Sequence, residues 1–194
     1  MKEIKNKILI IGGMPAGGKT SLSKRLCPKF KVPFLDKDLL FDDYTNYVTA
    51  KETFANDRHS PLYREVLRPL EYDLLWKAAL TQADLGISSV LVAPFTTELQ
   101  DKNLIKKFTK ELSEVNKDFQ LVTILVSAPP EDIKSRMIKR NRQEDKTKLA
   151  DWDNYIQGKI NFQKKASKIA DLSVVNKNLE DSLNLVINYL KKLD

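Results

Sequence analysis

The sequence has very few of the residues from which disulfides and zinc sites are built. Its 194 residues include one cysteine, Cys27, and one histidine, His59. A single cysteine cannot form an intrachain disulfide and is typical of a reducing compartment, so we expect a cytoplasmic protein. One cysteine and one histidine also cannot form a cluster with the spacing of zinc ligands. We expect Cys27 to pack in the interior and His59 to lie at the surface or cap a turn.

Long hydrophobic runs are missing as well. No apolar stretch approaches the length needed to span a bilayer, so we expect no membrane segment. Lysines at positions 2, 5 and 7 precede the apolar run 8–11 much as a signal peptide begins, but that run is too short and we expect no signal. The sequence shows no repeat, linker or low-complexity segment. Residues 1–194 are therefore expected to form a single domain.

The charge balance is basic but dispersed. The 33 lysine and arginine residues outnumber the 26 acidic residues, giving a net charge of +7, and the lysines are spread over many segments. A basic balance is found in proteins that bind nucleic acid, yet an enzyme that handles nucleotides also gains from a positive field around its cleft. Nucleic acid is therefore kept as an alternative partner and not favoured.

The segment 13–20, GMPAGGKT, matches the phosphate-binding motif G-x-x-x-x-G-K-[ST] at every fixed position. The apolar run Lys7 to Ile11 before it predicts a buried strand, and Lys19 to Leu26 predicts a helix. A strand, a glycine-rich loop and a helix point successive backbone N–H groups at an anion, and the helix N-terminus adds partial positive charge. A turn without a ligand is the alternative, but it does not require a lysine and a threonine at this spacing.

These residues form the first part of a predicted ATP site. Lys19 is expected to reach the β- and γ-phosphates as a catalytic residue, and the Thr20 hydroxyl is expected to bind Mg²⁺. The glycines of the loop are expected to allow positive φ angles and a close approach of the backbone to the phosphates. The predicted ATP-binding residues of the loop are Gly13, Met14, Pro15, Ala16, Gly17, Gly18, Lys19, Thr20 and Ser21.

Strand and helix patterns alternate along the whole chain. This alternation implies an α/β fold in which a parallel sheet is covered by helices on both faces, with right-handed crossovers. Ligands in such folds bind at the carboxyl ends of the strands. Pro33 favours an edge position for the second strand. The predicted strands are 7–11, 31–35, 87–95, 119–127 and 171–176.

A Ser-Pro pair at 60–61 has the pattern of a helix start. Beyond it, an apolar face is predicted from residues that recur at intervals of four, with two flanking leucines. The residues of the face are Val66, Leu70, Leu74 and Ala78, and the flanking ones are Leu67 and Leu75. Pro69 lies inside this pattern, so it should kink the helix or divide it in two.

Two further motifs separate the kinds of nucleotide-binding protein. Motor ATPases and GTPases usually carry a Mg²⁺-directing aspartate at the end of an apolar strand beside the loop strand. The candidate strands end in APF at 93–95 and SAP at 127–129, with no acid. The guanine-reading motif Asn-Lys-x-Asp is nearly complete at 176–179, but Leu179 stands where the acid is required. ATP is therefore favoured over GTP.

An Asp-Lys-Asp sequence at 36–38 follows the second predicted strand. With the phosphate loop, it makes the chain resemble the P-loop kinases of small acceptors, such as gluconate and shikimate kinases, and more distantly polynucleotide 5′-kinases and zeta-toxin-like kinases. Members of this group are often labelled AAA family ATPases. The resemblance implies a three-layer P-loop NTPase fold with a sheet of about five parallel strands in the order 2-3-1-4-5. The segment 42–68 departs from the characterised members.

The resemblance also implies roles for the two aspartates. Asp36 would help to hold the hydrated Mg²⁺. Asp38 would bind the acceptor and orient or deprotonate its hydroxyl as a catalytic residue, because phosphoryl transfer mainly needs positioning and charge neutralisation. Capping of the following helix is the alternative role for such a pair.

The segment RMIKRNR at 136–142 resembles the Arg-x-x-x-Arg that leads into the lid of nucleoside monophosphate kinases and their relatives. The resemblance implies that Arg136 lies against adenine and that Arg140 contacts the transferring phosphates as a catalytic residue. A short lid at 141–148, ordered with nucleotide bound, would follow. A solvated basic face is the alternative, since Asp132 lies one turn before Arg136.

Two more residues are candidates for the predicted site, and two tryptophans are assigned to packing. Asn176 follows the last predicted strand, where relatives contact adenine through backbone groups. Arg58 is a candidate for binding an anionic group on the acceptor, with a surface salt bridge as the alternative. Trp76 and Trp152 are expected to be packing residues and not part of a cofactor site.

The sequence thus predicts an ATP- and Mg²⁺-dependent phosphotransferase that moves the γ-phosphate to a hydroxyl of a small-molecule acceptor. One alternative is a polynucleotide 5′-hydroxyl kinase, which the basic charge favours. The other is a non-kinase, ATP-binding regulatory protein.

Overall fold

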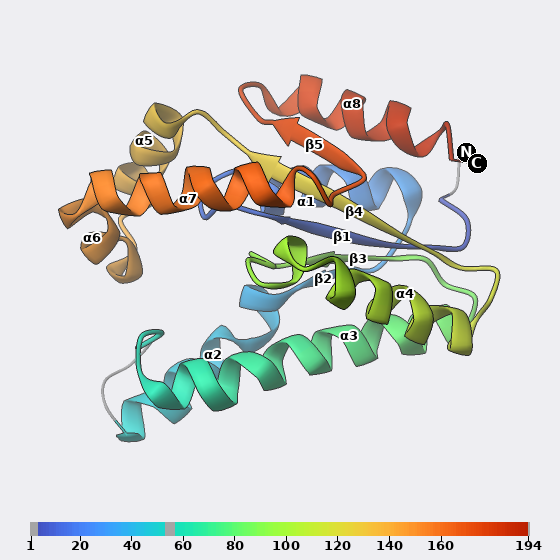
Figure 1. Cartoon of the computed structure of the whole chain (residues 1–194), viewed down its shortest axis with the longest axis horizontal. Coiled ribbons are helices and arrows are strands. Elements are labelled where there is room, and N and C mark those ends of the chain that lie inside the picture. Colours follow the sequence, from blue (N-terminus) through green and yellow to red (C-terminus); the bar gives the residue numbers. More distant parts are fainter. Residues whose placement is uncertain (1–3, 53–56, 194) are drawn as a thin grey trace.

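The computed structural model describes residues 4–52 and 57–193. Its strands form one sheet in which all neighbouring pairs are parallel (Figure 1). The strands are β1 (Lys7–Gly13), β2 (Phe34–Asp36), β3 (Ser89–Val92), β4 (Gln120–Ser127) and β5 (Leu172–Val175). Their order is β2-β3-β1-β4-β5. The predicted α/β class, strand number and strand order are therefore confirmed, and β2 lies at an edge, where Pro33 costs no ladder bond.

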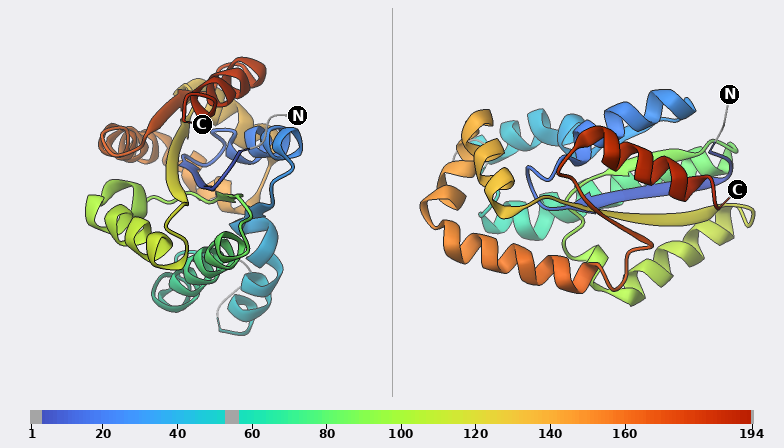
Figure 2. Two further views of the ribbon diagram at one scale, coloured as in Figure 1. Left: turned by 90° about the vertical axis from the view of Figure 1, so that its right-hand side faces the viewer. Right: turned by 90° about the horizontal axis from the view of Figure 1, so that it is seen from above.

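Helices connect the strands and lie on both faces of the sheet (Figure 2). They are α1 (Lys19–Phe30), α2 (Lys37–Glu52), α3 (Arg68–Asp84), α4 (Lys102–Val115), α5 (Pro130–Arg140), α6 (Gln143–Ala150), α7 (Trp152–Ala166) and α8 (Leu179–Leu190), with a π-helical turn η1 (Leu62–Leu67) and a 3-10 turn η2 (Glu98–Gln100). α1 runs four residues beyond the predicted end at Leu26, through Pro28 to Phe30.

The sheet separates two hydrophobic cores because strand side chains alternate between its faces. On β1, Ile8 and Ile10 belong to one core, and Leu9 and Ile11 belong to the other. Side chains of α3, α4, α5 and α7 contribute to the first core, and those of α1 and α8 contribute to the second. The carboxyl ends of the strands meet near α2, α5 and α6 (Figure 1). The phosphate loop therefore opens toward these helices.

The helical segment after residue 60 is continuous but changes its hydrogen-bond pattern next to Pro69, where a kink or a division was predicted. The π-helical turn ends at Leu67 and α3 begins at Arg68, whose N–H donates to the Tyr63 carbonyl five residues earlier. Because proline has no N–H, residue 69 cannot donate an α-helical hydrogen bond. A π-helical turn next to it therefore gives up fewer α-helical hydrogen bonds than it would elsewhere in a helix.

The centre of the predicted apolar face is wrong, whereas the two leucines predicted to flank it are buried. Leu70 and Leu74 are each 50% exposed, whereas Leu67 and Leu75 are buried together with Glu71. Glu71 is buried because it has an ionic partner on α2, and a charged residue in the buried stripe conceals that stripe from a hydrophobicity pattern.

Other predictions about single residues are confirmed. The Cys27 thiol is buried, and burial raises its pKa to about 12. Trp76 packs against Phe108 with ring centres 4.6 Å apart and donates from Nε1 to Glu111.

Among the described residues, no helix combines the length and apolarity that crossing a bilayer requires.

Candidate active site

The phosphate loop, residues 13–20, is held tightly at two glycines. Gly13 has a φ of +134°, and a Cβ there would lie 1.9 Å from the Val126 carbonyl oxygen on β4. Gly18 has a φ of +99°, and a Cβ there would lie 2.0 Å from the Asn176 amide nitrogen. A side chain at either position would therefore displace the loop.

Gly17 differs from the prediction of a positive φ. The positive φ in the middle of the loop, 58°, belongs to Ala16. Glycine at position 17 instead allows close packing, since a Cβ there would lie 3.0 Å from the Met14 carbonyl oxygen. The same carbonyl accepts the Gly17 N–H over 3.1 Å, which closes the loop on itself.

Lys19 reaches across the loop that it belongs to. Its ammonium donates to the carbonyl oxygens of Gly13 at 3.0 Å and Met14 at 2.9 Å. The side chain is buried, and burial lowers the pKa of Lys19 to about 8, although the negative charges of Asp38 and Asp36 oppose this. The amine is thus held inside the cradle that the motif forms for phosphate.

Asp36 connects the edge strand to the phosphate loop. Thr20 Oγ1 donates to Asp36 Oδ2 over 2.8 Å, and Asp36 is 4% exposed. Asp36 Oδ1 accepts the N–H groups of Asp38 at 3.0 Å and Leu39 at 3.4 Å, at the start of α2. The Asp36 carboxylate therefore caps α2 and also contacts the phosphate loop. Helix capping, which was the alternative role, is thus compatible with the predicted role at the loop.

Asp38 stands beside Asp36 with 40% of its side chain exposed. Its Oδ1 lies 3.0 Å from Lys37 Nζ and 3.4 Å from Arg58 Nη1. Burial raises the pKa of this carboxyl, but the charges of Lys37 and Arg58 outweigh burial and hold the pKa below its ordinary value. Asp38 is therefore ionised at neutral pH and able to accept a hydrogen bond.

A buried network behind Asp38 was not predicted from the sequence. Lys37 Nζ is 2.9 Å from Glu71 Oε2, and both side chains are almost fully buried. Glu71 also accepts hydrogen bonds from Thr45 and, over 3.2 Å, from the Tyr63 hydroxyl. The network joins α2, η1 and α3 and thereby fixes the lysine that contacts Asp38.

Arg58 is surrounded by carboxylates. Its guanidinium pairs with Asp38, with Asp42 and, at 3.8 Å, with Glu144 on α6. The Tyr63 hydroxyl accepts a further bond from Nη1 over 3.3 Å. Arg58 therefore links the helix that carries Asp38 to α6, so the ion pairs weighed in the sequence analysis are present here.

Arg136 and Asn176 meet at the other side of the loop. Arg136 donates to the carbonyl oxygens of Ala16 at 3.3 Å, Gly17 at 3.4 Å and Asn176 at 3.0 Å. The Asn176 amide also donates to the Gly17 carbonyl over 3.0 Å and accepts from Ser182. The side chain of Asn176, to which the sequence assigned no part, thus supports the loop.

Arg140 contacts the segment in which a short lid was predicted, and that segment is mostly helical. α6 covers most of the segment 141–148, and its Asp145 is buried. Arg140 Nη2 donates to Asp145 Oδ1 over 2.7 Å, and Lys148 pairs with the same oxygen at 3.2 Å. Arg140 is close enough to Lys19 for its positive charge to lower the pKa of that amine.

The two strands beside β1 carry no acid where they end. β3 and β4 flank β1, and their ends continue into Ala93 and Ala128. The Pro94 carbonyl, just beyond β3, accepts the Gly13 N–H over 3.0 Å. Among the described residues, no group of three histidine, cysteine or acidic side chains could hold a metal. The acidic groups at the loop are instead those at the end of β2 and at the start of α2.

Comparison with known proteins gives a family and a fold. Residues 8–158 match the family model described as an AAA domain. No curated protein sequence matches the chain. Shikimate kinase from Bacteroides thetaiotaomicron aligns with a TM-score of 0.62 and 16% identity over 95% of this chain and 98% of that one.

Two other solved structures show the same likeness. A gluconokinase from Sinorhizobium meliloti aligns with a TM-score of 0.56 and 15% identity over 99% of this chain and 95% of that one. APS kinase from Mycobacterium tuberculosis, in complex with AMPPNP and APS, aligns with a TM-score of 0.55 and 16% identity over 96% and 98%. At these identities the likeness establishes a shared fold.

Proposed function

Because the chain belongs to the AAA domain family, whose model covers residues 8–158, we propose that it is an ATP-dependent phosphotransferase. In this proposal it moves the γ-phosphate of ATP to a hydroxyl of a small-molecule acceptor. The observation that carries the proposal is the contact of Thr20 with Asp36 at 2.8 Å, with Asp38 two residues beyond. This arrangement supports a phosphate, a metal ion and an acceptor hydroxyl at neighbouring positions.

Thr20 and Asp36 would hold the Mg²⁺ ion. Both offer hard oxygen ligands, which Mg²⁺ prefers, and they already lie within hydrogen-bond distance of each other. The bound ion would neutralise negative charge on the β- and γ-phosphates. Asp36 is kept in place by the N–H groups at the start of α2, so the chain orients this ligand without the ion.

Lys19 and the loop backbone would bind the phosphates. The Lys19 ammonium would exchange its present carbonyl partners, Gly13 and Met14, for phosphate oxygens. This exchange replaces neutral acceptors by anionic ones, so it would raise the pKa of the amine and strengthen its bonds. Arg136 would stay between the loop and the Asn176 backbone, at the side proposed for adenine.

Asp38 would act on the acceptor. Its exposed oxygen would accept the hydrogen bond of the acceptor hydroxyl and align that oxygen with the γ-phosphorus. As the new O–P bond forms and the bond to ADP breaks, the hydroxyl proton would pass to the carboxylate of Asp38. Because Lys37 and Arg58 lower its pKa, Asp38 is a weak base and its main contribution would be orientation.

Arg140 would reach the transferring phosphate from α5. In the present structure its guanidinium is paired with Asp145, so this contact would require the ion pair to open or be shared. Arginine suits the role because its planar fork can bind two phosphate oxygens.

Label transfer from γ-labelled ATP tests the proposal. Pooled hydroxylated metabolites and, separately, 5′-hydroxyl oligonucleotides are incubated with the wild type, Lys19→Ala, Asp38→Asn and the matched control Asp43→Asn. Asp43 is an exposed residue of α2 outside the site. We expect label in a small molecule, with transfer abolished by Lys19→Ala, reduced about 100-fold or more by Asp38→Asn and unchanged by Asp43→Asn.

The other two functions are outcomes of the same assay. Label in the oligonucleotides, together with steep salt dependence of their binding, would identify a polynucleotide 5′-kinase. Label in neither pool, together with intact ATP binding, would favour a regulatory ATP-binding protein. Transfer that is insensitive to Asp38→Asn would contradict the role given to this residue.

A further inference from the structure

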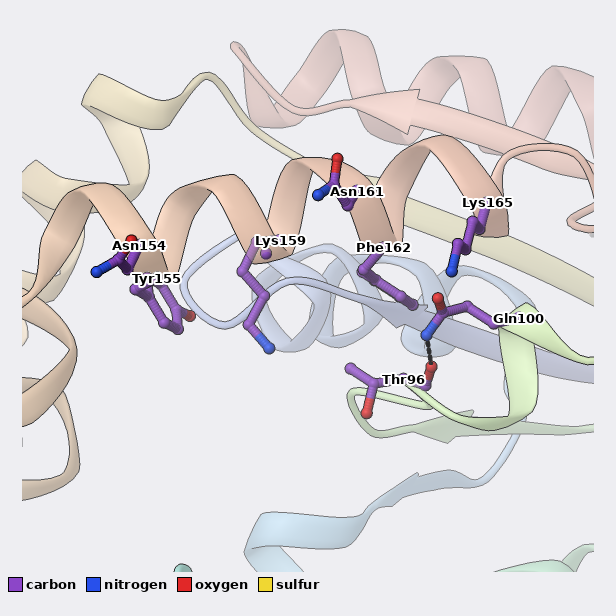
Figure 3. Close-up of a pocket in the computed structure, with 9 residues that line it drawn as sticks. Thr96, Gln100, Asn154, Tyr155, Lys159, Asn161, Phe162 and Lys165 are labelled. Carbon is purple, nitrogen blue, oxygen red and sulfur yellow. Dashed lines mark hydrogen bonds between the residues drawn. The ribbon is translucent and has the colours of Figure 1, made fainter.

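A pocket of about 470 Å³ opens between α7 and the turn that follows β3. Figure 3 shows the Lys159 side chain extending from α7 toward the turn that carries Thr96. The lining includes a second lysine, Lys165, as well as amide, hydroxyl and aromatic groups. Among the described residues that line the pocket, none is acidic. The chemistry of the lining therefore favours an anionic ligand over a cationic one.

Tyr155 supplies a hydroxyl without a hydrogen-bond partner. Its oxygen is buried and forms no hydrogen bond within the part of the chain that the structure describes. Burial and the negative charge of Asp145 raise the pKa of Tyr155, so the hydroxyl keeps its proton and can donate. Buried polar groups are rarely left unsatisfied in folded proteins, and a missing ligand is one reason for an exception.

Lys159 supplies a cation one helical turn beyond Tyr155. Its ammonium lies 5.4 Å from the centre of the Tyr155 ring, and it forms no ion pair with a carboxylate within residues 4–52 and 57–193. Burial, with a smaller effect from Lys148, lowers its pKa. The spacing of four residues places both groups on one face of α7. A ligand oxygen there would satisfy both.

The position of Lys159 connects the pocket to the proposed reaction. Lys159 is close enough to the phosphate loop for its charge to lower the pKa of Lys19. Arg58, the other candidate for binding an anion, already faces Asp38, Asp42 and Glu144. An anion at Arg58 would have to displace carboxylates, whereas at Lys159 it would displace none.

We propose that Lys159 and the Tyr155 hydroxyl bind a carboxylate or phosphate group of the acceptor molecule. This assignment rests on the proposed function, because it makes the pocket the distal part of the acceptor site. The acceptor would then be a small hydroxylated anion whose charged end lies at α7 and whose reacting hydroxyl lies at Asp38. Neutral alcohols of the same size would be poorer acceptors.

Calorimetry on the full chain saturated with AMPPNP and Mg²⁺ tests the assignment, because the phosphate loop is then filled. The probes are inorganic phosphate, glycerate and gluconate, glycerol 3-phosphate, and the neutral counterparts glycerol and sorbitol. The variants are Lys159→Met, Tyr155→Phe and the control Lys164→Met, which changes an exposed lysine of α7 that does not line the pocket. Carboxylate and phosphate probes distinguish the two sources of the anion.

We expect at least one anionic probe to bind at least about tenfold more tightly than its neutral counterpart. Lys159→Met should weaken that binding about tenfold or more, Tyr155→Phe about threefold, and Lys164→Met less than twofold. The assignment is overturned if no anionic probe is preferred, or if Lys159→Met binds as the wild type does. Anion binding without phosphate transfer would instead overturn the proposed function, and equal transfer to neutral and anionic acceptors would overturn the assignment alone.

Discussion

Thr20 Oγ1 donates a hydrogen bond to Asp36 Oδ2 over 2.8 Å, which joins the phosphate loop to the end of the edge strand β2. β2 is separated from β1 by β3, so this contact bridges strands that are not neighbours in the sheet. It gives the loop a carboxylate although the strands beside β1 end without one. The first prediction follows from this contact.

Asp36→Asn should raise the Mg²⁺ concentration needed for ATP turnover by about tenfold or more, because a neutral amide is a poorer ligand for a hard cation. Asparagine still caps a helix, so the free energy of unfolding should change by less than about 1 kcal/mol. Turnover as a function of Mg²⁺ measures the first effect and urea unfolding the second. An unchanged Mg²⁺ requirement would remove Asp36 from the proposed metal site.

Gly18→Ala should abolish nucleotide binding and destabilise the fold by about 1–3 kcal/mol, since the φ of +99° and the contact with Asn176 both oppose a Cβ. Gly158→Ala is the matched control. A Cβ at Gly158 would have nothing within 4 Å, so this change in α7 should stabilise the protein by about 0.5–1 kcal/mol. Nucleotide titration and thermal unfolding provide the measurements. Wild-type ATP affinity in Gly18→Ala would show that the loop is not the binding site.

Lys19→Met should make the nucleotide-free protein more stable at pH 7 while it abolishes ATP binding. The pKa of Lys19 is lowered to about 8, so between pH 8 and its unfolded value near 10.5 the unfolded chain binds more protons and stability rises with pH. The gain from Lys19→Met should be on the order of 1–3 kcal/mol at pH 7 and shrink as the pH rises toward 10. Urea unfolding at several pH values measures it, and a gain that does not depend on pH would argue against a buried, charged Lys19.

The Lys37–Glu71 pair should show strong coupling in a double-mutant cycle. Lys37→Met leaves the buried Glu71 carboxylate without its cation and should cost about 3–5 kcal/mol of unfolding free energy. Lys37→Met combined with Glu71→Leu removes both charges and should cost less than the single change. Chemical denaturation of the two singles and the double gives the coupling energy. Additive costs would mean that the pair contributes nothing as a pair.

The sequence was sufficient for the parts of the structure that depend on local patterns. The apolar runs at the five strands, the glycines of residues 13–20 and the edge-favouring Pro33 each act over a few residues, and all five strands form as predicted. Boundaries were less accurate: β3 is confined to Ser89–Val92, although the apolar run extends from 87 to 95.

Contacts between distant residues could not be predicted in this way. Lys37 and Glu71 are 34 residues apart and satisfy each other's charge only after α2 and α3 pack together. The same holds for Arg58 and Glu144, which pair although they are far apart in the sequence. The unpartnered hydroxyl of Tyr155 is visible only once its surroundings are known. Glu71, which lies four residues from both Leu67 and Leu75, was a local signal of such a contact.

α2 and the beginning of α3 bury polar groups and leave apolar ones exposed, although the rest of α3 buries apolar side chains. Thr45, Thr49 and Glu71 are buried, while Tyr44, Tyr47, Leu70 and Leu74 are at least half exposed. A protein engineer could therefore replace the outer leucines and tyrosines by charged residues without opening the interior, and improve solubility at little cost in folding. The usual strategy of making helix faces more hydrophobic on the inside would instead remove the groups that hold Lys37.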